Sequence, residues 1–255
     1  MYLYSFDRFF GFDKVCLLVE SGTKKKVKAG DLLVFGNQYF LALWETVSFP
    51  EQYQQLTSVQ AELIYKEFLS VPALKLFHWM VETYYTTYKS VVRLFFADDI
   101  QKLLEREWKF KAQSLKPKAQ SRFWKFNCSE EGQTLIVFPD LWTMFNTIAS
   151  EWWNPVATNG AGDEMMNWWN VVTLLASTTQ NQKDIHRWEI KKWIKSVIIC
   201  TYAEIFQDFH DLKKIIFIDP HKWYYANQQD PRYKVGDVLD EMKNLYGAEL
   251  EIIGI

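Results

Sequence analysis

Short apolar runs alternate with amphipathic stretches through the second half of the chain. Five runs have the length and composition of buried strands: 133–138, 171–176, 196–200, 214–219 and 249–255. Between them, the segments at about 141–152, 182–193 and 235–246 place apolar residues at helical spacing. Apolar strands that alternate with amphipathic helices predict a parallel sheet covered on both faces. We therefore expect an α/β lobe over residues 131–255.

The first half follows two other patterns. Residues 1–56 alternate apolar and polar positions around glycine turns, which predicts a small β unit. From 57 to 105 the period becomes helical, and Pro72 suits a helix start. The stripe along that helical segment is expected in the core and consists of Leu74, Phe77, Val81, Tyr84 and Tyr88. We place a β-rich domain at 1–105 and a basic linker at 106–130.

Charge restricts where a nucleic acid can bind. The 255-residue chain is 49% hydrophobic and 24% charged, which is globular, and its net charge of −2 excludes a chain-wide polycation. Any nucleic-acid contact needs local basic patches. One is "KKKVK" (24–28), with Lys24, Lys25, Lys26 and Lys28, and the other is the basic stretch at 109–125. A solvated loop is the alternative interpretation of each patch.

Cysteine usage and apolar run lengths indicate the compartment. Cys16, Cys128 and Cys200 are scattered, which argues against a disulfide framework and against zinc and fits a reducing cytosol. The start of the chain has no secretory pattern, and no apolar run is long enough to cross a membrane. We expect a soluble, cytoplasmic protein without a membrane partner.

Tryptophan is abundant and glycine is scarce. The chain has 12 tryptophans and 10 glycines, where an average protein of this length has about 18 glycines. The pairs in "EWWNP" (151–155) and "NWWN" (167–170) stand where glycine would make natural turns. We hypothesise that some tryptophan positions are glycine in the native protein, decoded from UGA.

Several segments in register resemble the primosomal protein N′ (PriA) family of replication-restart helicases. "GQTLIVFPDLWT" (132–143), "IICTYAEIF" (198–206) and "KIIFIDPHKWYYANQQDPRYKVGDV" (214–238) are similar to its motor motifs, and "LLASTTQNQKDIHRW" (174–188) is a weaker match. "LLVESGTKKKVKAGDLLVFG" (17–36) and "LKLFHWMVETYYTTYKSVV" (74–92) are similar to its 3′ DNA-end-binding domain. The resemblance implies that domain at 1–105 and an incomplete RecA-like lobe at 131–255.

The departures from that family concern the motor. A phosphate loop needs a Gly-Lys pair, and this chain has none. Asp219 stands at the family's Walker B position for magnesium, but Pro220 replaces the catalytic glutamate. We therefore expect no catalytic residue, no bound ATP or magnesium, and no zinc. Asp219 is a vestigial family position or a structural acid at a strand end, and His221 is a loop histidine.

The resemblance also implies DNA contacts after the Walker B strand. The family has an aromatic-rich loop there, and this chain offers Trp223, Tyr224, Tyr225, Arg232 and Tyr233. Aromatic rings stack on unpaired bases and arginine contacts phosphate; packing as ordinary core is the alternative. In the N-terminal domain, either Cys16 or Asp13 falls at the aspartate of the family's 3′-end pocket.

Three functional interpretations follow. The first is a DNA-binding protein of replication restart that binds forked or 3′-tailed DNA, assembles with primosome proteins and has an inactive ATPase motor. The second is the N-terminal half of a split 3′–5′ DNA helicase completed by another chain. The third is a degenerate helicase fragment.

Overall fold

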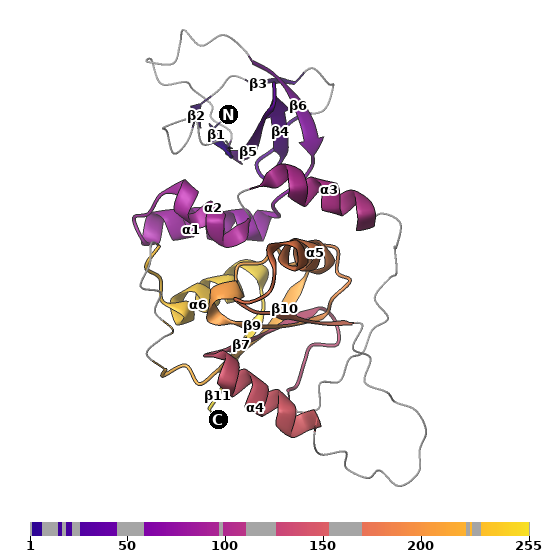
Figure 1. The fold of residues 1–255 in the computed structure, drawn as a ribbon. Helices are drawn as coiled ribbons and strands as arrows, with labels where there is room; N and C mark the ends of the chain where they lie inside the picture. The colour runs from indigo at the N-terminus through magenta and orange to yellow at the C-terminus, as the bar shows by residue number, and fades with distance from the viewer. Residues whose placement is uncertain are drawn as a thin grey trace. The chain divides into compact units, whose positions relative to one another are not determined.

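The computed structural model describes residues 2–6, 15–16, 19–21, 26–44, 59–96, 99–110, 126–152, 170–222, 225 and 231–254. The chain forms two compact units, Met1–Gln101 and Lys102–Ile255, with helix α3 (Ile100–Phe110) crossing the division (Figure 1). Of the linker expected at 106–130, residues 106–110 continue α3, residues 111–125 lie outside the described residues, and Phe126 is buried in the core.

The first unit is built on a small, mainly antiparallel sheet. Its strands are β1 (Tyr2–Ser5), β2 (Val15–Cys16), β3 (Val19–Ser21), β4 (Leu32–Phe35), β5 (Gln38–Trp44) and β6 (Val59–Tyr65). Four of them run antiparallel in the order β1-β5-β4-β6, and the short β2 and β3 extend the two edges. The prediction of a β unit is confirmed.

Strand β6 lies in a segment that we expected to be helical, and that expectation is wrong for residues 59–65. The segment alternates apolar Val59, Ala61 and Leu63 with polar Gln60 and Glu62. This period of two is the strand signal. Ala61 is buried in the sheet core while Glu62 is exposed, as the alternation requires.

Two helices follow the sheet: α1 (Val71–Thr83) and α2 (Tyr88–Phe95). The Ser70 side chain accepts a hydrogen bond from the Ala73 N–H and caps α1, while Pro72 stands in its first turn. The Thr87 side chain caps α2 in the same way. In the predicted stripe Leu74, Phe77 and Tyr88 are buried and Val81 and Tyr84 are partly buried, which confirms its place in the core.

A tight turn before β4 joins the sheet to the segment that leads into α1. Gly30 has φ +90°, and a Cβ there would stand 2.4 Å from the Leu69 carbonyl oxygen, so only glycine fits. The buried Asp31 carboxylate accepts hydrogen bonds from the Lys28 N–H at 2.8 Å and the Glu67 N–H at 2.9 Å. This acid is therefore structural.

The second unit is an α/β lobe compatible with a RecA-like fold. Its strands are β7 (Gln133–Phe138), β8 (Val171–Leu174), β9 (Val197–Thr201), β10 (Leu212–Ile218) and β11 (Glu249–Ile253). They form one parallel sheet in the order β11-β10-β7-β9-β8. The predicted parallel sheet is confirmed, with strand ends shifted by only a few residues.

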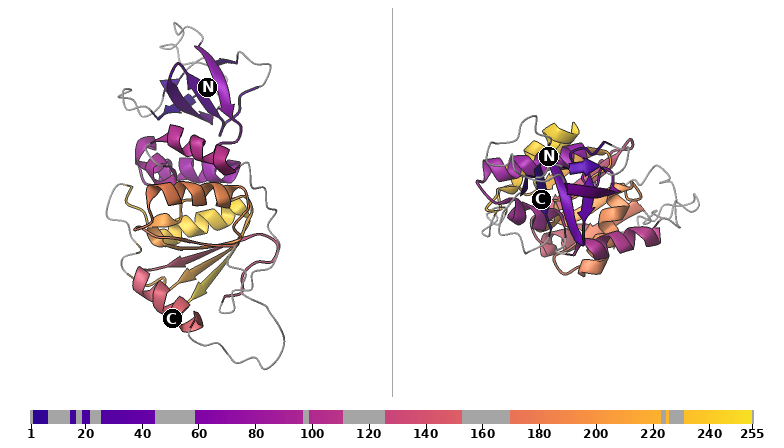
Figure 2. Two further views of the ribbon diagram at one scale, coloured as in Figure 1. Left: turned by 45° about the vertical axis from the view of Figure 1, so that its right-hand side comes forward. Right: turned by 90° about the horizontal axis from the view of Figure 1, so that it is seen from above.

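Helices cover both faces of this sheet. Helix α4 (Leu141–Trp152) lies on one face, and α5 (Gln180–Lys191) and α6 (Val235–Tyr246) lie on the other (Figures 1 and 2). On the α4 face, Met144 and Ile148 pack with Ile136, Phe138 and Ile216 in the hydrophobic core. Within the described residues, no helix combines the length and apolarity that crossing a bilayer requires.

The Gly30 turn gives a test of the first unit. We expect Gly30→Ala to lower the free energy of unfolding by about 2–4 kcal/mol, because the new methyl group meets a backbone oxygen and φ is positive. The matched control is Gly36→Ala, since Gly36 has φ +61° with no atom within 4 Å of the added Cβ. It should cost only about 1 kcal/mol. Equal losses in urea unfolding would refute the steric explanation.

Candidate functional site at the carboxyl edge of the parallel sheet

The order of the strands places a topological switch point at the carboxyl ends of β7 and β10. These strands are neighbours, but the crossover from β7 leads toward β8 on one side and the crossover from β10 leads to β11 on the other. In open α/β sheets, ligands bind outside the carboxyl ends at such a switch point. Asp140 follows β7 closely, and Asp219 follows β10 directly.

The two acids have different surroundings. The Asp140 carboxylate accepts hydrogen bonds from the Thr143 N–H at 2.7 Å and from the Thr143 hydroxyl at 2.8 Å, and so caps α4. Asp219 has φ +47°, and its N–H donates to the Ile253 carbonyl of β11 at 2.8 Å. Across the described parts of the chain, no group of three or more His, Cys, Asp or Glu residues is arranged to hold a metal ion.

Tyr225 covers the ends of the two strands. It is only 5% exposed, and its hydroxyl donates to the Ile218 carbonyl of β10 at 2.5 Å, with the Val137 carbonyl of β7 at 3.5 Å. Its ring meets Phe217 edge-on with centroids 4.6 Å apart and lies 6.3 Å from the Tyr202 ring. In this arrangement the ring is packed against the protein and presents no face to a base.

The other sequence-predicted residues of this loop divide by exposure. Tyr233 is 2% exposed and packs edge-on against Phe206 at 5.1 Å, whereas Arg232 beside it is exposed. Trp223 and Tyr224 lie outside the described residues. The structure therefore brings Asp219 and Tyr225 together at the switch point and leaves Arg232 as the outward-facing member of the set.

Two further cations at this edge escaped sequence reasoning. Lys222 follows β10 and Lys234 directly precedes α6, and both side chains are exposed. A signal was present for Lys234, because buried Pro231 and Tyr233 alternate strictly with exposed Arg232 and Lys234. Reading that alternation as period two would have pointed the basic side chains outward.

The first unit contains the remaining candidates. Lys26 and Lys28 are exposed on either side of buried Val27, so both basic side chains point away from the core. Lys24, Lys25 and Asp13 lie outside the described residues, as does the side chain of Cys16.

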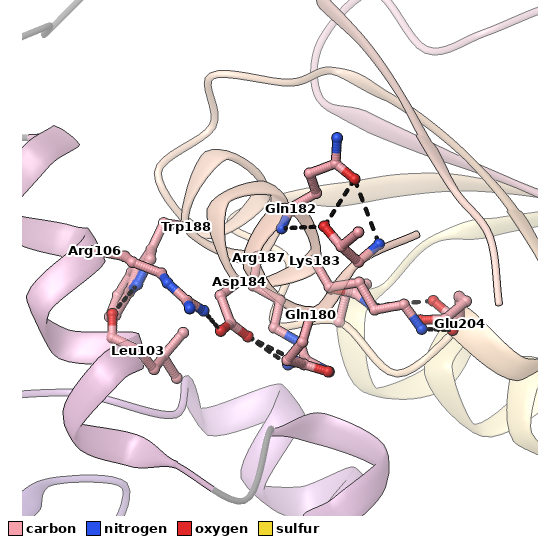
Figure 3. Close-up of polar contacts among 11 residues, drawn as sticks. Leu103, Arg106, Gln180, Gln182, Lys183, Asp184, Arg187, Trp188 and Glu204 are labelled. Atoms are coloured by element: carbon pink, nitrogen blue, oxygen red, sulfur yellow. Dashed lines mark hydrogen bonds and ion pairs between the residues drawn. The ribbon is translucent and has the colours of Figure 1, made fainter. Parts of the chain in front are cut away.

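A buried charge network holds α3 against α5 in the second unit (Figure 3). The Asp184 carboxylate, whose side chain is 1% exposed, forms ion pairs with Arg106 of α3 and with Arg187 at 3.1 Å. It also accepts a hydrogen bond from the Gln180 side-chain amide at 2.7 Å. The buried Trp188 indole N–H donates to the Leu103 carbonyl oxygen at 2.9 Å. The network is structural, because both arginines are already paired with the Asp184 carboxylate.

Three lysines in or directly after α5 are also paired with carboxylates. Lys183 bonds to Glu204 and Lys191 to Asp208. Lys192, the residue that caps the helix, meets Glu107 at 2.7 Å. These cations are neutralised by carboxylates of the same unit, so this helix offers little attraction for a phosphate.

Burial also shifts the pKa values of two groups in the second unit. Desolvation lowers the pKa of Arg187 to about 10, while the Glu204 carboxylate acts in the opposite direction. Arg187 therefore remains a cation at neutral pH. Burial, with a smaller contribution from Glu204, raises the pKa of the Cys200 thiol well above its usual value, so this cysteine stays protonated and is not a nucleophile.

No protein-family model matches this chain, and no curated protein matches it.

The Asp184 network gives a test of the second unit. Asp184→Asn leaves buried Arg187 and Arg106 without their carboxylate, and we expect the free energy of unfolding to fall by about 3–5 kcal/mol. Asp240→Asn on the exposed side of α6 is the control and should change it by less than about 0.5 kcal/mol. Urea unfolding measures both, and a small loss for Asp184→Asn would show that the ion pairs contribute little.

Proposed function

We propose that this chain is a PriA-like DNA-binding protein of replication restart that binds forked or 3′-tailed DNA without driving an ATPase motor. The observation that supports it most directly is the exposed basic set Lys222, Arg232 and Lys234 at the carboxyl edge of the RecA-like lobe. Lys26 and Lys28 supply a second basic surface on the first unit. Primosome proteins are the expected partners.

The basic residues after β10 bind DNA through its phosphates. Arginine and lysine on a surface attract the backbone without reading its sequence, and released counterions make the affinity fall with salt. Tyr233 takes a supporting role, because its buried ring fixes the backbone next to Arg232, and Tyr225 is buried against β7 and β10. This differs from direct stacking of those rings on bases.

Three observations support the inactive motor. The sequence has no Gly-Lys pair to cradle a phosphate, and Pro220 follows Asp219 where a water-positioning glutamate belongs. The Tyr225 ring also occupies the carboxyl ends of β7 and β10, the place at which this sheet topology usually receives a ligand.

Binding is tested by titrating the purified chain against a fluorescent 3′-tailed fork, a blunt duplex and single-stranded DNA at several salt concentrations. We expect the fork to bind most tightly. Arg232→Ala should weaken binding by about 1 kcal/mol, roughly fivefold, and reduce the salt slope by about 1.

Two variants control this experiment. Lys243→Ala removes an exposed cation from the far end of α6 and should leave the affinity unchanged. Tyr225→Phe keeps the buried ring and should also bind normally. Equal, weak binding of all three DNAs that Arg232→Ala does not alter would refute the proposal.

A second candidate function, half of a split helicase, is favoured by the open edge of the sheet. Among the described residues β11 pairs only with β10, and Ile252 on it is 62% exposed. Parallel sheets are normally covered, and an exposed strand edge is a template for another chain. Helix α4 also exposes Trp142 and Phe145, at 75% and 55%.

ATP hydrolysis by the chain alone distinguishes an inactive motor from an active one. We expect no hydrolysis above the buffer rate with or without DNA, and no difference between the chain and Asp219→Asn. DNA-stimulated hydrolysis that Asp219→Asn abolishes would overturn the inactive motor. A stable complex with the product of an adjacent gene that gains such hydrolysis would favour the split helicase.

A further inference from the structure

The end of α5 adopts a backbone conformation that proteins usually assign to glycine. After Lys192, which caps the helix, Trp193 has φ +55°. Its N–H donates to the Ile190 carbonyl at 3.0 Å, and the Ile194 N–H donates to the Glu189 carbonyl at 2.8 Å. This pair of bonds is the Schellman motif, in which the left-handed residue is most often glycine.

Helix α6 ends with the same 6→1 bond around a left-handed residue, and that residue is glycine. Gly247 has φ +66°, and the Ala248 N–H donates to the Lys243 carbonyl at 3.0 Å, six residues back counting both ends. The two helices cover the same face of the sheet. The same turn is thus built once with glycine and once with tryptophan in one unit.

The backbone conformation alone does not decide the residue. Tyr85 has φ +49° after α1, and the Thr86 N–H donates to the Val81 carbonyl at 3.3 Å, so an aromatic residue stands in a similar turn there. Tyr85 and Trp193 differ in their codons. UGA is read as tryptophan or as glycine, whereas no tyrosine codon has this ambiguity. For Trp193, the left-handed turn and the excess of tryptophan over glycine in the chain both favour glycine.

A buried tryptophan of the same helix differs from Trp193. Trp188 is 2% exposed, and its indole N–H donates to the Leu103 carbonyl oxygen, so glycine there would open a large cavity and leave that oxygen unpaired. Trp193, by contrast, is only partly buried, and its ring stacks on His210 with centroids 5.5 Å apart. Trp188 is therefore needed by the core, whereas Trp193 is not.

We propose that residue 193 is glycine in the native protein, encoded by UGA, while residue 188 is a true tryptophan encoded by UGG. The excess of tryptophan over glycine along the chain, 12 against 10, is then a result of reading UGA as tryptophan. We extend the proposal to the tandem pairs at 152–153 and 168–169 on sequence context alone, because asparagine flanks each pair as in a glycine turn. The inference is independent of the DNA-binding proposal.

Mass spectrometry of the protein isolated from its own cells decides the matter. Cleavage after glutamate yields the peptide 190–204, which contains Trp193 as its only tryptophan, and the peptide 165–189, which contains Trp168, Trp169 and Trp188. We expect the first to be lighter by one tryptophan-to-glycine difference and the second by two, with fragmentation placing tryptophan at 188. Codon 193 in the gene should be UGA. Tryptophan at 193 would overturn the proposal.

A stability measurement on the recombinant chain gives a second readout. Trp193→Gly should raise the urea midpoint of the second unit, because glycine adopts positive φ without steric cost. Trp188→Gly is the matched control and should lower the midpoint sharply. A lower midpoint for Trp193→Gly would contradict the assignment of glycine to this turn.

Discussion

The buried amide of Gln133 holds the parallel sheet together at its amino edge. Its side-chain NH₂ donates to the Ile190 and Lys195 carbonyls at 2.8 and 2.9 Å, and its oxygen accepts from the His210 and Asp211 N–H groups at 2.8 and 3.1 Å. Every hydrogen-bonding position of the amide is used. Gln133 begins the central strand, so one side chain ties the segments that enter β9 and β10 to β7. Gly132 before it admits this approach, since a Cβ there would lie 2.6 Å from the Asp211 carbonyl oxygen.

Because the amino edge is fixed in this way, the opposite edge is where the lobe presents variable chemistry. The strands leave Gln133 and its neighbours in fixed register, and at the other end Tyr225 bonds to the Ile218 carbonyl, one residue before Asp219. Tyr225 and Tyr233 are buried there, whereas Lys222, Arg232 and Lys234 are exposed. A rigid sheet with charged residues after the carboxyl ends of its strands is the usual basis of binding in α/β folds.

The fold of the second unit was largely predictable because its signals are local. The bounds of β7, α4 and α6 follow from apolar periodicity, and the observed elements match the expected ranges 133–138, 141–152 and 235–246. The candidate site was predictable only in part. Sequence reasoning found Asp219 and Arg232, but it did not establish which aromatics are buried, because that depends on packing against Phe206 and Phe217 from other segments. The pairing of Arg106 with Asp184 joins residues 78 positions apart and leaves no local pattern.

The exposed strand β11 also carries a safeguard against self-association. Glu249 and Glu251 alternate along it, and the nearly buried Lys214 of β10 pairs with Glu251 at 2.7 Å and lies 3.9 Å from Glu249. One lysine therefore faces two carboxylates, so the strand retains surplus negative charge. Two copies of this edge brought together in a concentrated solution would set like charges side by side, which opposes fibril-like stacking. A strand rich in lysine or arginine would meet no such repulsion, so the edge discriminates between neighbours by charge.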